Sequence, residues 1–394
     1  MVSPNVRILA DQHIYHLEQF VPPHVELIYY DSSKHLPRLD SFDAWILRTV
    51  TKVNPKTVPT LPKKLKFIGS ASSGTDHIDK GYLNDLGIQF DYSPGCNANA
   101  VAEYVLTSML TWCELKHKEL IDYKVGIIGM GHTGEAVAKK LEVIGVNYAG
   151  YDPPKALREK SFKSCSLNTL HECAILSFHL PYISQGSKCT HYFMPNILSL
   201  SPKQELIINA ARGGIINESY LLNSIRSYES SHNKIDVVLD VWETEPVPNP
   251  ELVKKAIIAT PHIAGYSKKA KLEASKGVLK SLLNYFDLKC ADNVSQVSPL
   301  NLQKSIPKES NLNEIKIKSY YKSINVLHGL YKYDYEMQNL ISRSTLEYES
   351  NRHKTVIGES FQSIRNTILL REEFKYMTFP EGYPEYLRPI FKIN

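Results

Sequence analysis

A glycine-rich turn after an apolar run constrains the fold of this chain more than any other feature. Residues 125–128 are apolar and predict a buried strand, and residues 135–144 have the apolar periodicity of a helix. Residues 146–151 predict a second strand, which Asp152 follows directly. Between the first strand and the helix stand three glycines with G-x-G-x-x-G spacing: Gly129, Gly131 and Gly134. Such a turn is common alone, but the whole βαβ unit with its final acid is typical of dinucleotide-binding domains.

Each part of this unit has a physical role in binding a dinucleotide. The glycines permit a tight turn, close approach of a pyrophosphate, and close packing of the helix on the sheet. Free N–H groups at the helix start, from His132 and Thr133 onward, can hold the phosphates. The Asp152 carboxylate can accept both ribose hydroxyls and would repel a 2′-phosphate, so we predict NAD rather than NADP. The nearby Lys155 and Arg158 are expected in a solvated basic turn. A flavodoxin-like unit without a cofactor is the alternative.

Length and composition narrow the class of protein. A chain of 394 residues, 43% hydrophobic and 22% charged, is long enough for two or three globular domains. A net charge of +5 from scattered lysines argues against a nucleic-acid partner and suits small anionic ligands. No targeting segment and no run of about 18 apolar residues is present, so we expect no membrane partner. Six cysteines without C-x-x-C pairs predict neither a metal site nor disulfides, and favour a cytoplasmic protein. Cys96 has no adjoining base and is expected to be a packed thiol.

Before the glycine turn, alternating strands and helices predict a small parallel α/β domain. Its strands are expected at residues 6–10, 25–30, 44–47 and 66–69. Arg48 and Thr49 follow the third of these strands and Ser72 the fourth, where open α/β sheets bind ligands. These side chains suit an anionic, polyhydroxylated substrate, but ordinary turn chemistry explains them equally well. Residues 98–118 predict a long helix that leads into the glycine-rich unit.

Four more predicted strands follow Asp152, and each ends in a polar residue. The strands are expected at residues 174–178, 205–211, 234–239 and 256–260. The residues that follow or end them are His179, Arg212, Asp240 and His262. Because carboxyl ends of parallel strands form the ligand edge of a doubly wound sheet, we expect these side chains near one site.

Three side chains from this edge match the needs of hydride removal from an alcohol beside a carboxylate. A histidine such as His262 can accept the hydroxyl proton near neutrality, and a carboxylate such as Glu245 can orient the imidazole. An arginine such as Arg212 can grip the substrate carboxylate with two hydrogen bonds. Asp240 is expected on the nicotinamide side. Taken singly, these residues also fit a surface arginine, an acid in a proline-rich turn and a helix-capping histidine.

Several stretches resemble the D-isomer-specific 2-hydroxyacid dehydrogenases. In that family a nucleotide domain is inserted in a smaller substrate domain. Within it, residues 51–54 (Thr-Lys-Val-Asn) and 262–266 (His-Ile-Ala-Gly-Tyr) are similar to the erythronate-4-phosphate dehydrogenase branch. The resemblance extends from residue 6 to about residue 290, and further matching stretches are residues 69–79, 94–98, 152–154, 209–213 and 238–243.

The resemblance implies an α/β fold with three domains. A doubly wound, parallel-sheet (Rossmann) NAD domain at residues 98–264 would be inserted in a flavodoxin-like substrate domain, residues 1–97 with 265–294. A small α+β dimerisation domain would follow at residues 295–394, beginning with a polar linker at 295–311. The implied activity is NAD-dependent oxidation of 4-phospho-D-erythronate to (R)-3-hydroxy-2-oxo-4-phosphooxybutanoate, for pyridoxine biosynthesis, by a homodimer. Another D-2-hydroxyacid such as 3-phosphoglycerate, or a non-catalytic NAD-binding scaffold, is the alternative.

The resemblance also assigns roles to single residues. Arg212, Glu245 and His262 would be catalytic. The residues that would contact the substrate are Arg48, Thr49, Ser72 and Tyr266. Those that would contact NAD, besides the glycine turn, are Asp152, Leu180, Asp240 and Gly265. Thr49 and Ser72 keep the family's hydroxyl groups, whereas Leu180 replaces a frequent threonine, so its contact would be through the backbone.

Two C-terminal arginines have two possible roles. Arg365 and Arg371 lie in stretches that are similar to a helix of the dimerisation domain. A salt-bridged helix face is the expected role. The alternative is that they reach a partner's active site and contact the substrate phosphate.

Overall fold

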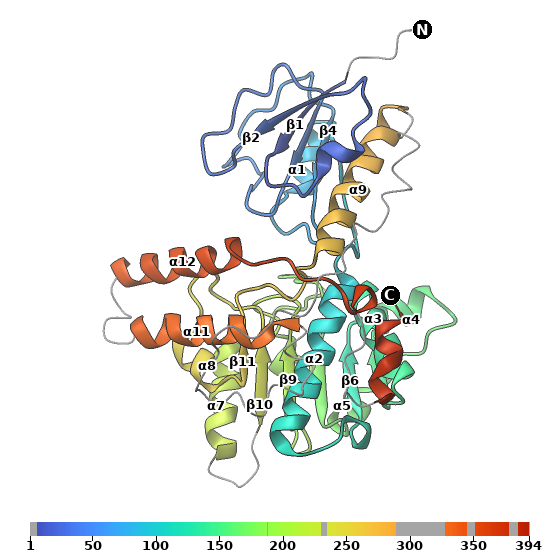
Figure 1. The fold of residues 1–394 in the computed structure, drawn as a ribbon, viewed down its shortest axis with the longest axis vertical. Helices are drawn as coiled ribbons and strands as arrows, with labels where there is room; N and C mark the ends of the chain where they lie inside the picture. Colours follow the sequence, from blue (N-terminus) through green and yellow to red (C-terminus); the bar gives the residue numbers. More distant parts are fainter. Residues whose placement is uncertain are drawn as a thin grey trace. The chain divides into compact units, whose positions relative to one another are not determined.

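The structure is a computed structural model in which the chain forms two compact units. It describes residues 6–186, 188–229, 235–288, 328–344, 351–377 and 385–393. One unit comprises Met1–Asn97 and Ser267–Gln303, and the other Ala98–Tyr266 and Lys304–Asn394. Each unit carries one sheet of parallel strands (Figure 1). The predicted α/β fold is therefore confirmed.

The first unit has the strand order of a flavodoxin-like sheet. Its five parallel strands lie in the order β2-β1-β3-β4-β5. They are β1 (Arg7–Asp11), β2 (Glu26–Tyr30), β3 (Ala44–Leu47), β4 (Phe67–Ser70) and β5 (Gln89–Tyr92), with helices η1 (Leu17–Phe20), α1 (Lys80–Asp85) and α9 (Lys268–Tyr285). The apolar side of α9, including Val278 and Leu282, packs with Ile8 and Phe67 in one core cluster. Helix α9 follows the inserted region in the sequence, whereas the five strands precede it. The first unit is therefore built from the chain segments on both sides of that region.

The second unit is a six-stranded doubly wound sheet. Its parallel strands lie in the order β11-β10-β9-β8-β6-β7. They are β6 (Val125–Ile128), β7 (Tyr148–Tyr151), β8 (Ile175–Phe178), β9 (Leu206–Asn209), β10 (Asp236–Leu239) and β11 (Ile258–Ala259). The chain turns to one side of β6 to form β7 and then to the other side to form β8. The carboxyl ends of β6 and β8 therefore flank the switch point at which such sheets bind ligands.

Helices cover both faces of this sheet and separate two cores. They are α2 (Ala98–Lys116), η2 (Leu120–Asp122), α3 (His132–Val143), α4 (Pro153–Arg158), α5 (Leu167–His171), α6 (Phe193–Asn196), α7 (Glu218–Glu229) and α8 (Pro250–Lys255). Neighbouring residues of β6 point to opposite faces, so Ile127 packs in the core with α2 and α3 and Ile128 in the other core. Helix α2 is buried along most of its length. Apolar residues occur on every side of this helix, as is typical of a helix that is buried all round.

The described C-terminal residues belong to the same unit as the six-stranded sheet. They form α11 (Leu330–Ser344), α12 (Asn351–Asn366), η5 (Phe374–Tyr376) and η6 (Glu385–Phe391). Helix α11 lies beside the edge strand β11 (Figure 1), where Asp334 accepts a hydrogen bond from the N–H of Ala259 at 2.8 Å. Gln338 donates to the Val253 carbonyl oxygen of α8 at 2.8 Å. Helix α11 thus covers a sheet edge that would otherwise expose unpaired backbone groups.

Three further observations bear on the predicted organisation. The separate dimerisation domain at residues 295–394 stays a prediction, and its linker at 295–311 lies outside the described residues. Within the described part of the chain, no helix is long and apolar enough to cross a membrane. Among the same residues, no group of three or more His, Cys, Asp or Glu side chains is arranged to hold a metal ion.

Candidate active site

The glycine turn has the shape that a dinucleotide site requires. A Cβ atom on Gly134 would lie 2.0 Å from the Gly129 carbonyl oxygen, so only glycine allows α3 to pack this closely. Beside Gly131, by contrast, no atom of the described residues lies within 4 Å of the Cβ position, which leaves the backbone open to a ligand. Helix α3 begins at His132 without a side-chain cap. The N–H groups around His132 and Thr133 are therefore available to phosphate oxygens.

Asp152 follows β7 beside the glycine turn, and its neighbour Lys155 is held there as well. The two Asp152 carboxylate oxygens accept hydrogen bonds from the N–H groups of Met130 and Lys155, each at 2.9 Å. The expected solvated position of Lys155 is wrong: the side chain is buried, donates to the Met130 carbonyl oxygen at 2.9 Å, and pairs with Glu135. The reason is that its long stem packs under the turn, with the ammonium group 5.1 Å from the Phe162 ring centroid. Arg158 is exposed.

The end of β8 closes the other side of the switch point. A Cβ on Gly129 would lie 2.7 Å from the carbonyl oxygen of His179, so this strand end touches the glycine turn. The His179 ring contacts the Ser177 hydroxyl at 2.9 Å, and burial lowers the pKa of the imidazole to about 3. His179 is therefore neutral at physiological pH. Leu180 follows it at the strand end and is half-buried.

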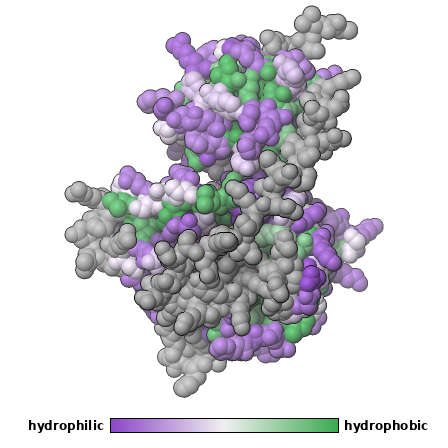
Figure 2. Space-filling view, in the orientation of Figure 1, coloured by the Kyte–Doolittle hydropathy of each residue, from purple (hydrophilic) through white to green (hydrophobic). Residues whose placement is uncertain are grey.

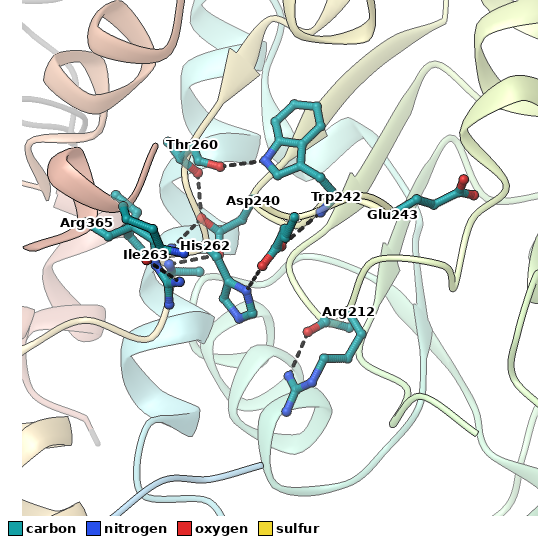
Figure 3. A network of polar contacts seen from close by, with 12 residues as sticks. Arg212, Asp240, Trp242, Glu243, Thr260, His262, Ile263 and Arg365 are labelled. Atoms are coloured by element: carbon teal, nitrogen blue, oxygen red, sulfur yellow. Dashed lines mark hydrogen bonds and ion pairs between the residues drawn. The ribbon is translucent and has the colours of Figure 1, made fainter. Parts of the chain in front are cut away.

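His262 and Glu245 form the pair that the sequence predicts. The His262 Nδ1 lies 2.9 Å from Glu245 Oε2, and the Trp242 N–H donates to Glu245 Oε1 at 3.0 Å (Figure 3). Burial acts to raise the pKa of Glu245, but His262, the Trp242 N–H and Arg365 together hold it below its ordinary value. A charged carboxylate only accepts hydrogen bonds, so Nδ1 of His262 carries a proton, and in the neutral ring the free lone pair then lies on Nε2. His262 adopts a positive φ of 57°, an uncommon backbone state for a residue other than glycine.

Asp240 fixes the backbone that presents His262. Its Oδ1 accepts from the Thr260 hydroxyl at 2.6 Å and from the Ile263 N–H at 2.7 Å, and its Oδ2 accepts from the Ala264 N–H at 2.9 Å. The N–H of His262 donates to the Asp240 carbonyl oxygen at 2.7 Å. Asp240 is fully buried, and burial raises the pKa of its carboxyl group. Its contact with NAD stays a prediction, and the observed bonds make Asp240 the anchor of the loop.

Arg212 stands after β9 on a loop that touches the Trp242 loop directly. A Cβ on Gly213 would lie 1.9 Å from the Trp242 carbonyl oxygen, so a side chain there would separate the two loops. Asn209 holds the loop from within, donating to the Arg212 carbonyl oxygen at 3.0 Å. Arg212 Nη1 donates to the Ala211 carbonyl oxygen at 2.7 Å. The loops that carry Arg212 and Glu245 are thus fixed to one another.

Two glutamates tie the same loops together from the other side. The Glu218 N–H donates to Glu243 Oε1 at 2.9 Å, and the Glu243 N–H donates to Glu218 Oε1 at 2.7 Å. Burial, together with the charges of Glu243 and Glu245, raises the pKa of Glu218 to about 7. This reciprocal pair could not be predicted from the sequence, because its members are 25 residues apart. Both sit near the predicted catalytic residues, but no local spacing marks them as partners.

Tyr266 meets a residue of the C-terminal helix α12. Arg365 Nη2 donates to the Tyr266 hydroxyl at 3.2 Å, and the guanidinium carbon lies 6.0 Å from the Tyr266 ring centroid. Gly265 stands next to Tyr266, after the backbone that Asp240 holds. Arg371 forms a salt bridge, as expected, but with the buried Glu103 of α2 at 2.5 Å rather than on a helix face. Arg365 thus lies within the unit that carries His262.

The predicted substrate contacts of the first unit lie at the carboxyl ends of β3 and β4. Arg48 pairs with the buried Asp11 at 2.9 Å and donates to the Ser32 hydroxyl at 3.2 Å. Thr49 is exposed. Ser72 donates to the Gly74 carbonyl oxygen at 2.7 Å, and its oxygen lies 2.7 Å from the Ser70 hydroxyl. The guanidinium of Arg48 therefore neutralises a buried carboxylate within its own sheet, and Ser72 is held in a hydroxyl network.

Cys96 lies in the first unit, two residues before the inserted unit begins, and its thiol is partly buried. Burial raises the pKa of its thiol to about 12, so the thiolate is scarce at neutral pH.

Comparisons with known proteins agree with this geometry. A family model described as D-isomer specific 2-hydroxyacid dehydrogenase, NAD binding domain, matches residues 100–264. An erythronate-4-phosphate dehydrogenase from Psychromonas ingrahamii is 36% identical over 286 residues, which span 72% of this chain and 73% of that protein. The enzyme of that name from Bacteroides thetaiotaomicron is 33% identical over 75% of this chain and 84% of its own length. The chain belongs to the erythronate-4-phosphate dehydrogenase family.

Membership places the chain among the D-isomer-specific 2-hydroxyacid dehydrogenases and confirms the predicted NAD-dependent enzyme class. The fold has further support from an NAD+-bound 3-phosphoglycerate dehydrogenase of Entamoeba histolytica, with a TM-score of 0.56 and 24% identity. That match covers 72% of this chain and 96% of the other. The prediction of NAD as the cofactor is confirmed, and the open backbone at Gly131 and the uncapped start of α3 fit its pyrophosphate.

Proposed function

We propose that this chain oxidises 4-phospho-D-erythronate at C2 to (R)-3-hydroxy-2-oxo-4-phosphooxybutanoate, with NAD as oxidant, in pyridoxine biosynthesis. The observation that carries the proposal is the hydrogen-bonded pair of His262 and Glu245, 2.9 Å apart, beside the Arg212 loop. The names of the curated relatives support the phosphorylated four-carbon substrate. The same constellation would serve other D-2-hydroxyacids, so the substrate rests on the relatives and the reaction type on the geometry.

In this proposal, each residue moves or holds a defined group. Nε2 of His262 takes the proton as the O–H bond of the C2 hydroxyl breaks, and a C2–O double bond forms while the hydride leaves C2. Bound NAD supplies the acceptor for that hydride. Glu245 holds the Nδ1 proton and stabilises the imidazolium cation that results. Arg212 pairs with the C1 carboxylate and fixes C2 in front of the base. In the opposite direction, His262 returns the proton to the carbonyl oxygen.

We propose a homodimer formed through the C-terminal helices, in the cytoplasm. Figure 2 shows hydrophobic residues along α12 on the face drawn there. Val356 of that helix is 50% exposed and Leu369, just beyond it, is 77% exposed. Apolar side chains exposed to this extent on α12 and just after it favour burial against another copy of the chain. Sedimentation of wild type beside Val356→Glu, with Leu157→Glu as the exposed apolar control, tests this part.

The first test is NADH formation with 4-phospho-D-erythronate and 3-phosphoglycerate, in wild type and His262→Ala. We expect wild type to prefer 4-phospho-D-erythronate. Loss of the base should lower kcat by about 10²–10⁴-fold. NADH binding, followed by protein fluorescence, should persist in the variant because its fold and glycine turn are intact.

Three other outcomes would each contradict a different part of this proposal. Preference for 3-phosphoglycerate would keep the mechanism and reject the substrate. NAD binding without turnover of either acid would favour the non-catalytic scaffold. Turnover unchanged in His262→Ala would reject His262 as the base.

A further inference from the structure

A second arginine stands at the catalytic pair, on a helix outside the segment that the family model matches. Arg365 lies in the last turn of α12 (Asn351–Asn366), whereas the matched segment ends at residue 264. Its Nη2 donates to the Tyr266 hydroxyl at 3.2 Å, four residues after His262. The C-terminal helix therefore brings a permanent positive charge to the loop that carries the base.

Among the described residues no carboxylate forms a hydrogen bond with Arg365, and its charge acts on Glu245 only at longer range, where it helps to lower the pKa of that carboxyl group. The nitrogens of Arg365 contact only neutral oxygens among the described residues, those of Tyr266 and of Gln362, the latter at 3.5 Å. Its Nε is buried and has no hydrogen-bond partner in that part of the chain. Burying donors of a cation without an acceptor costs free energy, so a half-buried arginine of this kind is expected to serve an anion. Arg371, by comparison, forms an ion pair with the carboxylate of Glu103.

The position of Arg365 suits the far end of a substrate whose near end is held by Arg212. In Figure 3 the two arginines lie on opposite sides of the His262 ring. A substrate with a carboxylate at C1, a reacting hydroxyl at C2 and a phosphate at C4 has its anionic groups on opposite sides of the reacting carbon. The order of the protein groups, Arg212, His262 and Arg365, thus matches the order of the substrate groups, carboxylate, hydroxyl and phosphate.

We propose that Arg365 binds the phosphate of the substrate in the active site of its own chain, with the Tyr266 hydroxyl beside it. This inference rests on the proposed phosphorylated substrate. A guanidinium group presents two parallel N–H donors to phosphate oxygens, which gives both affinity and orientation. Tyr266 holds the guanidinium by its hydroxyl and its ring face. Selection for a phosphorylated acid then depends on the C-terminal helix, while the chemistry depends on the inserted unit.

The test separates the phosphate from the rest of the substrate. The dissociation constants of 4-phospho-D-erythronate and D-erythronate are measured by calorimetry on the full-length protein saturated with NADH. We expect Arg365→Gln to weaken binding of the phosphorylated acid by about 10–100-fold, the value of a charge-assisted hydrogen bond. Binding of D-erythronate should change by less than about twofold, because the lost contact is absent from that ligand. Arg365→Lys should restore part of the affinity for the phosphorylated acid only.

Lys354→Met provides the matched control, since it removes one positive charge from the exposed start of the same helix. It lies 11 residues before Arg365, about 16 Å away along the helix axis. Neither ligand should bind differently to it. Equal weakening of both ligands by Arg365→Gln, or no weakening of either, would overturn the inference. NADH formation in the same preparations reports separately on the proposed reaction, because binding is measured without turnover.

Discussion

At the scale of single residues, the active-site geometry depends on carboxylates that accept backbone N–H groups. Asp240 accepts two such groups and a hydroxyl, and thereby holds the loop in which His262 takes a positive φ. Glu245 accepts the Trp242 N–H with one oxygen and contacts His262 with the other. Because each oxygen has its own partner, neither carboxylate can rotate without losing a bond. The imidazole is therefore preorganised before any substrate arrives.

A substitution at Glu245 tests this orientation. We expect Glu245→Gln to lower kcat by about 10²–10⁴-fold, because an amide cannot stabilise the imidazolium and can donate to Nδ1. Donation to Nδ1 would leave the proton of the neutral ring on Nε2, where the base must be free. Steady-state NADH formation measures the loss, and NADH fluorescence should show unchanged cofactor binding. Glu245→Asp, which keeps the charge, is the companion variant; a Gln variant as active as wild type would remove Glu245 from the mechanism.

Much of the candidate site was predictable at this scale, and the exceptions have physical causes. Arg212, Asp240 and His262 all follow predicted strands, and parallel strands bring such positions to one edge. The environment of Lys155 was not predictable, since packing of its stem under the glycine turn depends on the position of Phe162 and Glu135. The contact of Arg365 with Tyr266 was not predictable: a salt-bridged helix face was expected, with a partner's active site as the alternative, because a separation of 99 residues leaves no local pattern.

At the scale of elements, the loops after β9 and β10 are held together by direct contacts. The Gly213 backbone touches Trp242, and Glu218 and Glu243 exchange hydrogen bonds at the other end of the same contact. The carboxylates of Glu218 and Glu243 lie close to one another, so a negative charge on both at once would cost free energy. The raised pKa of Glu218 is the expected consequence.

The pH dependence of stability should report on this pair. Glu218 is an acid whose folded pKa is about 7, above its ordinary 4.5, so the folded state keeps a proton that the unfolded state has lost. Its contribution is complete below about pH 4.5 and is lost as pH rises toward and through 7, in total about 3 kcal/mol. Glu218→Gln keeps an acceptor for the Glu243 N–H and does not titrate. The variant should therefore lose less stability over this window than wild type, as measured by urea unfolding.

The control for this measurement is Glu251→Gln, which removes a carboxylate from an exposed pair with Arg226. We expect that variant to follow the pH profile of wild type. A Glu218→Gln profile that parallels wild type would mean that Glu218 is ionised in the folded protein.

The elements themselves followed from the sequence except where the pattern was weak. Strands β1–β4 and β6–β11 were predicted within a few residues, because buried parallel strands are continuous apolar runs. Strand β5 (Gln89–Tyr92) was missed: it is a half-exposed edge strand in which polar and aromatic residues alternate. The helix predicted at 98–118 ends at Lys116. No pattern in α11 indicated that Asp334 would bond to β11, because that contact is made by tertiary packing.

At the scale of the whole chain, the last residues complete the core of the nucleotide-binding unit. Phe374, Ile390 and Phe391 pack in the same cluster as α2 and α3. Beneath them, the fully buried Glu103 pairs with Arg371 and accepts a hydrogen bond from the Phe374 N–H at 2.9 Å. Lys140 of α3 lies 3.8 Å from the same carboxylate. Burial raises the pKa of Glu103 and lowers that of Lys140, so both charges depend on this network.

Removal of one cation from this network should therefore weaken the whole unit rather than the C-terminus alone. Arg371→Met leaves Glu103 buried without its closest partner, which typically costs about 3–5 kcal/mol. Arg388→Met, in the same segment, breaks an exposed pair with Glu385 and should leave the unfolding midpoint unchanged. Urea unfolding followed by the fluorescence of Trp112 and Trp242, both buried in this unit, measures the difference. If Arg371→Met frees the C-terminal residues to proteolysis while the tryptophan transition stays in place, the segment is an accessory to the core. If the two signals move together, the segment is part of the core, and the residues that follow the helix carrying Arg365 are anchored in the same unit as His262.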